Sequence, residues 1–285
     1  CVALGETRKT EGAAPARGVL LPSRPPAQMA NATIRCAATL GEPPALMMSW
    51  ETSKWFFADP PGDYASDIEV LGMPEFLGSS TNLLGMLLVW LSVRTSYTEL
   101  HSNARRCIQW MLFYLTMHAA IHMTWGYKFR VPFTSAMNIA FAWMRHYGFS
   151  VSWLEASPTR ANKGRRISEA LVYLLALLNL VIVSPRGLTV GVTSFVQPLL
   201  LWPLRFWVDG WRTTNHMRWL VGFSVLWWTF SFFIKRELQA GAGCTWLNTH
   251  LTAETFGIAG NLCLVVYIVK VTRDGIRDGS EKKGA

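Results

Sequence analysis

Seven long apolar segments follow one another along this chain, and most of the charged residues lie between them. The segments cover residues 76–94, 107–126, 132–152, 168–185, 188–208, 218–235 and 253–272. A helix needs about 20 apolar residues to cross the hydrocarbon core of a bilayer. Backbone groups in that core must be bonded within the protein, which favours helices for segments of this length. The sequence therefore predicts an all-α fold, a seven-helix transmembrane bundle.

The composition agrees with a membrane protein. Hydrophobic residues make up 51% of the chain and charged residues 16%, whereas soluble domains carry about 25% charged residues. The formal net charge of +9 is expected to lie on one side of the membrane and to face acidic lipid headgroups. There is no RNA-binding or nucleotide-binding motif. We therefore expect membrane lipids, and no nucleic acid, as partners.

Three regions are predicted. Residues 1–74 contain no apolar span and are rich in Pro, Ala and Gly, which predicts a largely irregular extramembrane arm. A partner chain could hold this arm, or the arm could fold back over loops of its own side. Residues 75–273 form the seven-span domain, and residues 274–285 form a charged tail. The chain starts at Cys1, which fits either a removed targeting segment or an incomplete sequence.

The distribution of Lys and Arg predicts the orientation. With seven spans, the first, third and fifth connections share a side with the C-terminus, and that side holds most of the basic residues near the spans. The opposite connections hold Lys128, Arg130, Arg186, Lys235 and Arg236. By the positive-inside rule, the C-terminus lies on the cytosolic or equivalent face.

Two groups of basic residues carry more detailed predictions, one about lipid binding and one about the end of a helix. The segment Thr159–Arg166 is the densest basic stretch, and its residues Arg160, Lys163, Arg165 and Arg166 are candidates for binding lipid headgroups. An ordinary topology signal is the alternative. Arg145 and His146 interrupt the third segment, and we expect His146 to mark the end of that helix at headgroup level.

Two pairs of polar residues with helical spacing suggest a site inside the bundle. His118 and His122 are four residues apart in the second segment, and His250 and Glu254 are four apart before the last one. Residues with this spacing share a helix face. Three imidazoles and one carboxylate form a reasonable tetrahedral zinc set. A metal-free group of mutually hydrogen-bonded side chains is the alternative.

Several short stretches carry a resemblance to a known family. They are EFLGSSTN at 75–82 with Glu75, Phe76 and Asn82, the segment from Ala120 to Thr124 followed by Tyr127, Gly222 to Glu237 with Trp227 and Trp228, and His250 with Gly257. In these positions the chain resembles the alkaline ceramidases, seven-span zinc amidases of the wider CREST group. The resemblance covers about residues 50–272 and implies a zinc site in the membrane.

Departures from the family pattern bear on catalysis. The resemblance places the three zinc-binding histidines at His122, His250 and Glu254, so that one of them is replaced by a carboxylate. It places the family's serine at His118 and its aspartate at or next to Phe133. The family's calcium motif is not recognisable, because neither 49–51 nor 54–59 carries the carboxylates that calcium requires. No catalytic residue and no calcium site are therefore assigned.

These observations predict a catalytically degenerate, ceramidase-like membrane protein that serves as a structural, lipid-binding accessory subunit of a larger membrane complex. The residual metal site would consist of His118, His122, His250 and Glu254, with zinc as the ion. The mitochondrial inner membrane is the expected location, with the endoplasmic reticulum or Golgi as the alternative. The alternative function is an active zinc-dependent amide hydrolase of ceramide-type sphingolipids.

Overall fold

A computed structural model describes residues 33–34, 38–39, 64–65, 68–69, 76–123, 127–151, 153, 156–181, 196–209, 216–240 and 246–281. The two candidate remnants of the calcium motif, at 49–51 and 54–59, lie outside these residues. Side chains are described for 76–123, 133–151, 153, 156–178, 196–209, 216–233 and 252–274.

Seven α-helices make up most of the described residues. They are α2 (Phe76–Val93), α3 (Ser102–Met123), α4 (Tyr127–Ser150), α5 (Pro158–Val181), α7 (Gln197–Asp209), α8 (Met217–Ala240) and α9 (Trp246–Glu281), with a short 3₁₀ helix η2 (Tyr97–Glu99). Each helix overlaps one of the predicted apolar segments, so the all-α fold class is confirmed.

Four two-residue strands lie within the region predicted as an irregular arm. β1 (Thr33–Ile34) pairs antiparallel with β4 (Ile68–Glu69). β2 (Ala38–Thr39) pairs in the same way with β3 (Tyr64–Ala65). The two pairs place β1 beside β4 and β2 beside β3, and β4 also contacts α2.

The helix boundaries correct the prediction in two places. α5 begins at Pro158 and not at residue 168, so the basic segment Thr159–Arg166 is helical rather than a connection. Proline suits the first turn of a helix because its missing N–H would have no partner there. α9 continues to Glu281, so most of the tail predicted at 274–285 extends the last helix.

The start of α3 shows how a loop histidine is used locally. The backbone N–H of Asn103 donates to Nδ1 of His101 at 3.2 Å, which satisfies one of the free amides of the first turn. Burial and, to a smaller extent, the nearby Arg105 lower the pKa of His101. A neutral ring with Nδ1 as acceptor fits this capping contact.

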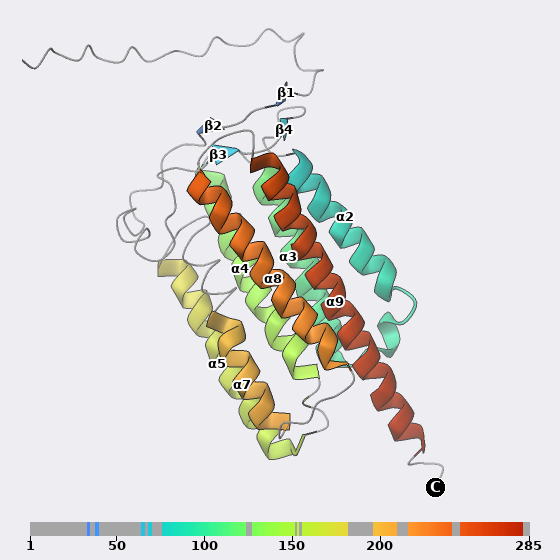
Figure 1. Cartoon of the computed structure of the whole chain (residues 1–285). Helices are drawn as coiled ribbons and strands as arrows, with labels where there is room; N and C mark the ends of the chain where they lie inside the picture. Colours follow the sequence, from blue (N-terminus) through green and yellow to red (C-terminus); the bar gives the residue numbers. More distant parts are fainter. Residues whose placement is uncertain are drawn as a thin grey trace, which may run out of the picture.

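The helices run up and down the molecule in alternation, as Figure 1 shows. α3 contacts α2, α4 and α9, and α9 also packs along α8. α5 lies against α4 and α7. The N-terminal end of α3 and the C-terminal ends of α2 and α9 therefore lie at the same end of the bundle (Figure 1).

Aromatic side chains from three helices fill the centre of the bundle. Ring centroids of Phe141 on α4 and Trp227 on α8 are 4.3 Å apart, and Tyr114 on α3 lies 5.1 Å from Phe141 and 5.7 Å from Trp227. The indole N–H of Trp227 donates to Oδ1 of Asn261 on α9 at 3.2 Å. A Cβ at Gly260 would lie 2.9 Å from the same indole, so α8 and α9 approach closely only because this residue is glycine.

Two helices among the described residues are long and apolar enough to cross a membrane. They are Phe76–Val93, with 18 residues, and Thr252–Asp274, with 23 residues. The first is the whole of α2, and the second lies within α9. These two helices also border the candidate site described below.

Candidate metal centre

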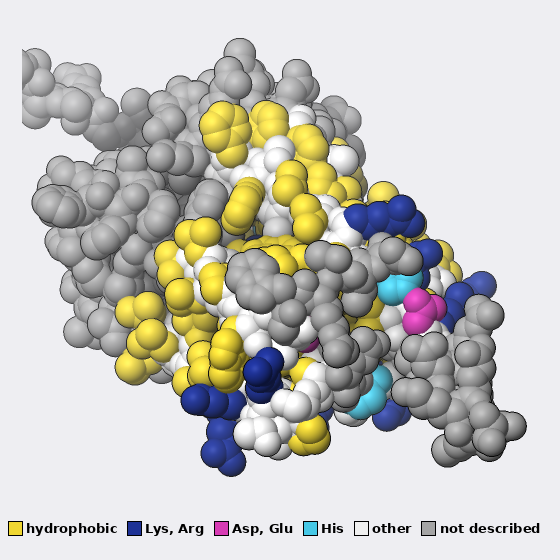
Figure 2. Space-filling view, turned by 60° about the horizontal axis from the view of Figure 1, so that its bottom comes forward, with side chains coloured by type: hydrophobic (Ala, Val, Ile, Leu, Met, Phe, Trp, Pro, Cys, Tyr) yellow, Lys and Arg dark blue, Asp and Glu magenta, His cyan; other side chains and the backbone are white. Residues whose placement is uncertain are grey.

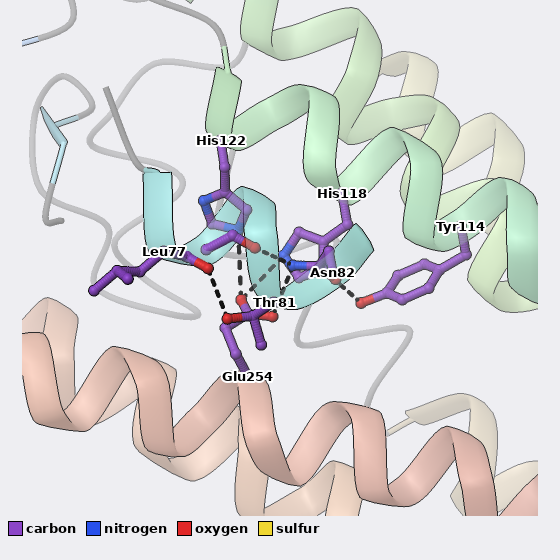
Figure 3. A network of polar contacts seen from close by, with 8 residues as sticks. Leu77, Thr81, Asn82, Tyr114, His118, His122 and Glu254 are labelled. Atoms are coloured by element: carbon purple, nitrogen blue, oxygen red, sulfur yellow. Dashed lines mark hydrogen bonds and ion pairs between the residues drawn. The ribbon is translucent and has the colours of Figure 1, made fainter. Parts of the chain in front are cut away.

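Three helices place buried polar side chains at one point inside the bundle. His118 and His122 come from α3, Glu254 comes from α9, and Asn82 comes from α2 (Figure 3). The exposed fractions of these four residues are 8%, 4%, 2% and 1% in that order. Burial of so many polar groups at one point is costly unless they bind one another or an ion.

The sequence of α3 explains why its polar side chains line up. Tyr114, His118 and His122 are spaced four residues apart, so they form one row along the helix. In Figure 3 this row faces α9 and α2, with Tyr114 at one end and His122 at the other. α9 lies opposite this row, and the N-terminal half of α2 passes beside it and supplies Asn82.

Both imidazoles face the same carboxylate oxygen. Nε2 of His118 lies 3.3 Å from Oε1 of Glu254, and Nε2 of His122 lies 3.4 Å from that oxygen. The two imidazole centroids are 4.9 Å apart. The three donor atoms therefore converge on one point between α3 and α9.

Two outer contacts orient these side chains. Nδ2 of Asn82 donates to Oε2 of Glu254 at 3.0 Å and to the carbonyl oxygen of Gly78 at 2.9 Å. The hydroxyl oxygen of Tyr114 lies 3.0 Å from Nδ1 of His118. The Asn82 contact holds Oε2 of Glu254, and the Tyr114 contact holds Nδ1 of His118. In both side chains this is the atom that does not face the point of convergence. This is how second-shell partners orient metal ligands.

Gly78 allows His122 to lie against α2. A Cβ at this position would be 2.7 Å from Nδ1 of His122 and 2.9 Å from two ring carbons. Real Cβ atoms do not make contacts this short, so any larger residue would displace the ring. Gly78 on α2 thus determines where the imidazole of His122 on α3 can lie.

The arrangement could hold a metal ion. The ligand atoms of His118, His122 and Glu254 all lie within 4.8 Å of one another. Imidazole nitrogen and carboxylate oxygen are ligands of Zn²⁺ and other first-row metals. Within the described part of the chain, these three side chains form the group of His, Cys, Asp or Glu residues whose ligand atoms lie close enough together to hold a metal ion.

The structure brings together three of the four predicted metal ligands. His118, His122 and Glu254 meet as their spacing suggested. His250 lies on α9 one turn before Glu254, but its side chain is outside the described residues. Two partners, Asn82 and Tyr114, were not predicted as part of the site. Tyr114 could have been found by extending the four-residue spacing one step before His118.

Other predicted residues lie elsewhere. Arg160, Lys163, Arg165 and Arg166 are all exposed near the start of α5. The expectation for His146 is wrong, because α4 continues to Ser150 and both Arg145 and His146 are completely buried. Nδ1 of His146 lies 2.8 Å from Oγ of Ser168 on α5, and the guanidinium carbon of Arg145 lies 4.0 Å from the ring centroid of Phe141. Packing against α5 and aromatic rings covers these side chains.

Comparisons with protein-family models, curated proteins and solved structures found no match to this chain.

The contact between Tyr114 and His118 predicts a graded loss of metal affinity. Replacing Tyr114 with phenylalanine removes the hydroxyl that fixes His118, and affinity for Zn²⁺ is expected to fall about 10- to 100-fold, as for other outer partners of metal ligands. Competition with a chromophoric chelator measures this affinity. Tyr147→Phe is the matched control, because Tyr147 contacts Arg106 instead. Equal affinities of wild type and Tyr114→Phe would contradict the prediction.

Proposed function

We propose that this chain is a ceramidase-like multi-pass membrane protein that has lost hydrolase chemistry, holds a zinc ion between α2, α3 and α9, and serves as a lipid-binding accessory subunit of a membrane complex. The observation that carries the proposal is the Glu254 carboxylate. It is the one carboxylate in the cluster of described residues, and its contacts orient it as a ligand.

The distribution of side chains supports a bundle embedded in lipid. Large apolar side chains are exposed on several helices, among them Leu84, Leu87, Trp90, Tyr173, Leu174, Leu177, Leu199, Leu200, Val225 and Phe232. Polar side chains are buried, among them Asn82, His118, His122, Arg145, His146, Gln197 and Glu254. Soluble proteins rarely expose large contiguous apolar surfaces, and polar residues of membrane helices face the bundle interior. Like α2, the helices α5, α7 and α8 therefore also present exposed apolar side chains suited to contact with lipid.

The distances favour zinc over a group held by hydrogen bonds alone. Charge-assisted hydrogen bonds from nitrogen to oxygen are typically about 2.7–2.9 Å long, and the two contacts to Glu254 Oε1 measure 3.3 and 3.4 Å. In a tetrahedral zinc site with bonds of about 2.0–2.1 Å, neighbouring ligand atoms are separated by about 3.3–3.4 Å. The two distances to Glu254 Oε1 match this edge length, and the ligand atoms of all three residues lie within 4.8 Å of one another.

Among the side chains of this cluster that the structure describes, none is placed to act as the base for hydrolysis. When bound, zinc would supply Lewis acidity, and hydrolysis would also require a group that accepts a proton from water. Glu254 is used as a ligand, the amide of Asn82 cannot accept that proton, and the hydroxyl of Tyr114 contacts His118. If His250 supplies a fourth ligand, the site is closed as in structural zinc centres.

We propose an accessory role because a site without hydrolytic chemistry leaves a structural function for the bundle. A closed zinc centre would tie α3 to α9, with α2 joined through the contact of Asn82 with Glu254, and the outer surface of the bundle is then the part that meets lipids and protein partners. We propose that the C-terminus lies on the positive-inside face, because Lys and Arg are in excess on that side of the predicted spans. We propose the mitochondrial inner membrane as the location.

Metal analysis and an amidase assay on protein purified in detergent test this function together. We expect about one zinc per chain, co-purification with other membrane proteins, and no release of fatty acid from a ceramide substrate. Zinc with ceramide hydrolysis would instead establish the active amidase, because two His and one Glu also form the ligand set of catalytic zinc sites. Purification as a metal-free monomer would contradict the proposal.

A further inference from the structure

The start of α5 presents basic and apolar side chains on one exposed face. Arg160, Lys163, Ile167 and Leu174 are separated by three, four and seven residues, so they lie on the same side of the helix. All four are exposed. The face therefore changes from cationic to apolar within about one helical turn, between Lys163 and Ile167.

α7 adds a second strip beside this face. A Cβ at Gly164 would collide with Val208, so the glycine allows α5 and α7 to lie in close contact at this level. Nζ of Lys163 lies 5.6 Å from the ring centroid of Trp207 on α7, and that tryptophan is 42% exposed. Two turns before Trp207, Leu200 is also exposed. On α7, Trp207 thus lies at the level of the basic residue Lys163, and Leu200 lies farther along at the level of the apolar side chains.

Arg165 is set apart from these residues. Its Nε lies 3.9 Å from Oε1 of Glu169, so a carboxylate already balances its charge. Figure 2 shows Lys and Arg side chains gathered at this end of the molecule, next to hydrophobic side chains. Arg160 and Lys163 are thus the exposed cations that share a helix face with Ile167 and Leu174.

We propose that the seam formed by Arg160, Lys163, Ile167 and Leu174 of α5 with Leu200 and Trp207 of α7 binds an acidic phospholipid. The phosphate lies against Arg160 and Lys163, and the acyl chains run along Ile167, Leu174 and Leu200. Tryptophan is favoured at the level where headgroups meet hydrocarbon, and long basic side chains reach toward phosphates at that level. The charge complementarity selects an acidic lipid. This inference rests on the membrane part of the proposed function.

Retention of lipid by the purified full chain tests the seam. The protein is placed in mixed micelles with equal amounts of phosphatidylglycerol and phosphatidylcholine, and bound lipid is measured by native mass spectrometry. The wild type is expected to retain phosphatidylglycerol preferentially. In the Arg160→Gln/Lys163→Gln variant, this preference is expected to fall roughly 30-fold, as two basic residues near an acidic surface would give.

A matched variant separates a specific seam from the general positive charge of this end. Arg105→Gln/Arg218→Gln also removes two exposed cations, and Arg218 lies 5.7 Å from the ring centroid of Trp219. This control should keep the preference of the wild type. An equal loss in both variants, or no preference in the wild type, would overturn the seam. Release of the protein from membranes by carbonate without detergent would instead overturn the membrane part of the proposed function.

Discussion

Replacing Glu254 with glutamine is expected to remove the bound metal. The amide keeps the size of the side chain and its contact with Asn82, but it loses the negative charge that two imidazoles and a cation share. An amide oxygen is a much weaker zinc ligand than a carboxylate, and we expect affinity to fall at least about 100-fold. Elemental analysis after gel filtration measures zinc per chain.

The control for this variant is Glu169→Gln. Glu169 is a partly exposed carboxylate of α5 that contacts Arg165, away from the cluster. Its variant should keep the zinc content of the wild type. A chelator should also lower the unfolding temperature of the wild type and of Glu169→Gln, because bound metal stabilises the folded state. Full zinc occupancy in Glu254→Gln would show that the ion is held elsewhere.

The second large effect is expected from a single methyl group on α2. In Gly78→Ala the new Cβ would lie 2.7 Å from Nδ1 of His122, so the imidazole must shift from the position in which it faces Glu254. Zinc affinity should then fall at least about tenfold, as it does when the orientation of a ligand is lost. In itself, alanine stabilises a helix by about 1 kcal/mol relative to glycine. A loss of metal would therefore arise from the position of the ring and not from helix propensity.

Gly85→Ala provides a control on the same helix. Gly85 lies two turns after Gly78, and its Cβ would meet Cγ1 of Ile258 at 3.0 Å. An isoleucine side chain can adjust its rotamer, and Ile258 is not part of the metal cluster. Zinc affinity of Gly85→Ala should stay within about twofold of the wild type. Equal losses in both glycine variants would point to general disruption of α2 packing.

Local spacing explains which parts of the site were predictable. His118 and His122 are one turn apart on α3, and a helix always places residues four apart on the same face. Glu254 was found by the same rule as the partner of His250. These predictions needed no knowledge of how helices pack. They also needed no assumption about the family.

Contacts between helices were not predictable in the same way. Asn82 donates to a carboxylate 172 residues further along the chain. The sequence shows that Asn82 is a polar residue within an apolar segment, but it does not show which way its side chain points. The rotation of each helix about its own axis depends on which residues pack between helices, such as Gly78 beneath His122. His146 was misplaced for this reason, since burial against α5 requires a particular rotation of α4.

By itself, the sequence determined the seven helical segments, the row of histidines on α3 and the basic stretch Thr159–Arg166, although not that this stretch is helical. Hydrophobic length and the 3.6-residue period of the helix are sufficient for these features. Only the tertiary structure decided that Glu254 faces both imidazoles, that Asn82 and Tyr114 support them, and that Lys163 meets Trp207. Those contacts join separate helices, and their geometry is set by close packing rather than by the spacing within any one segment.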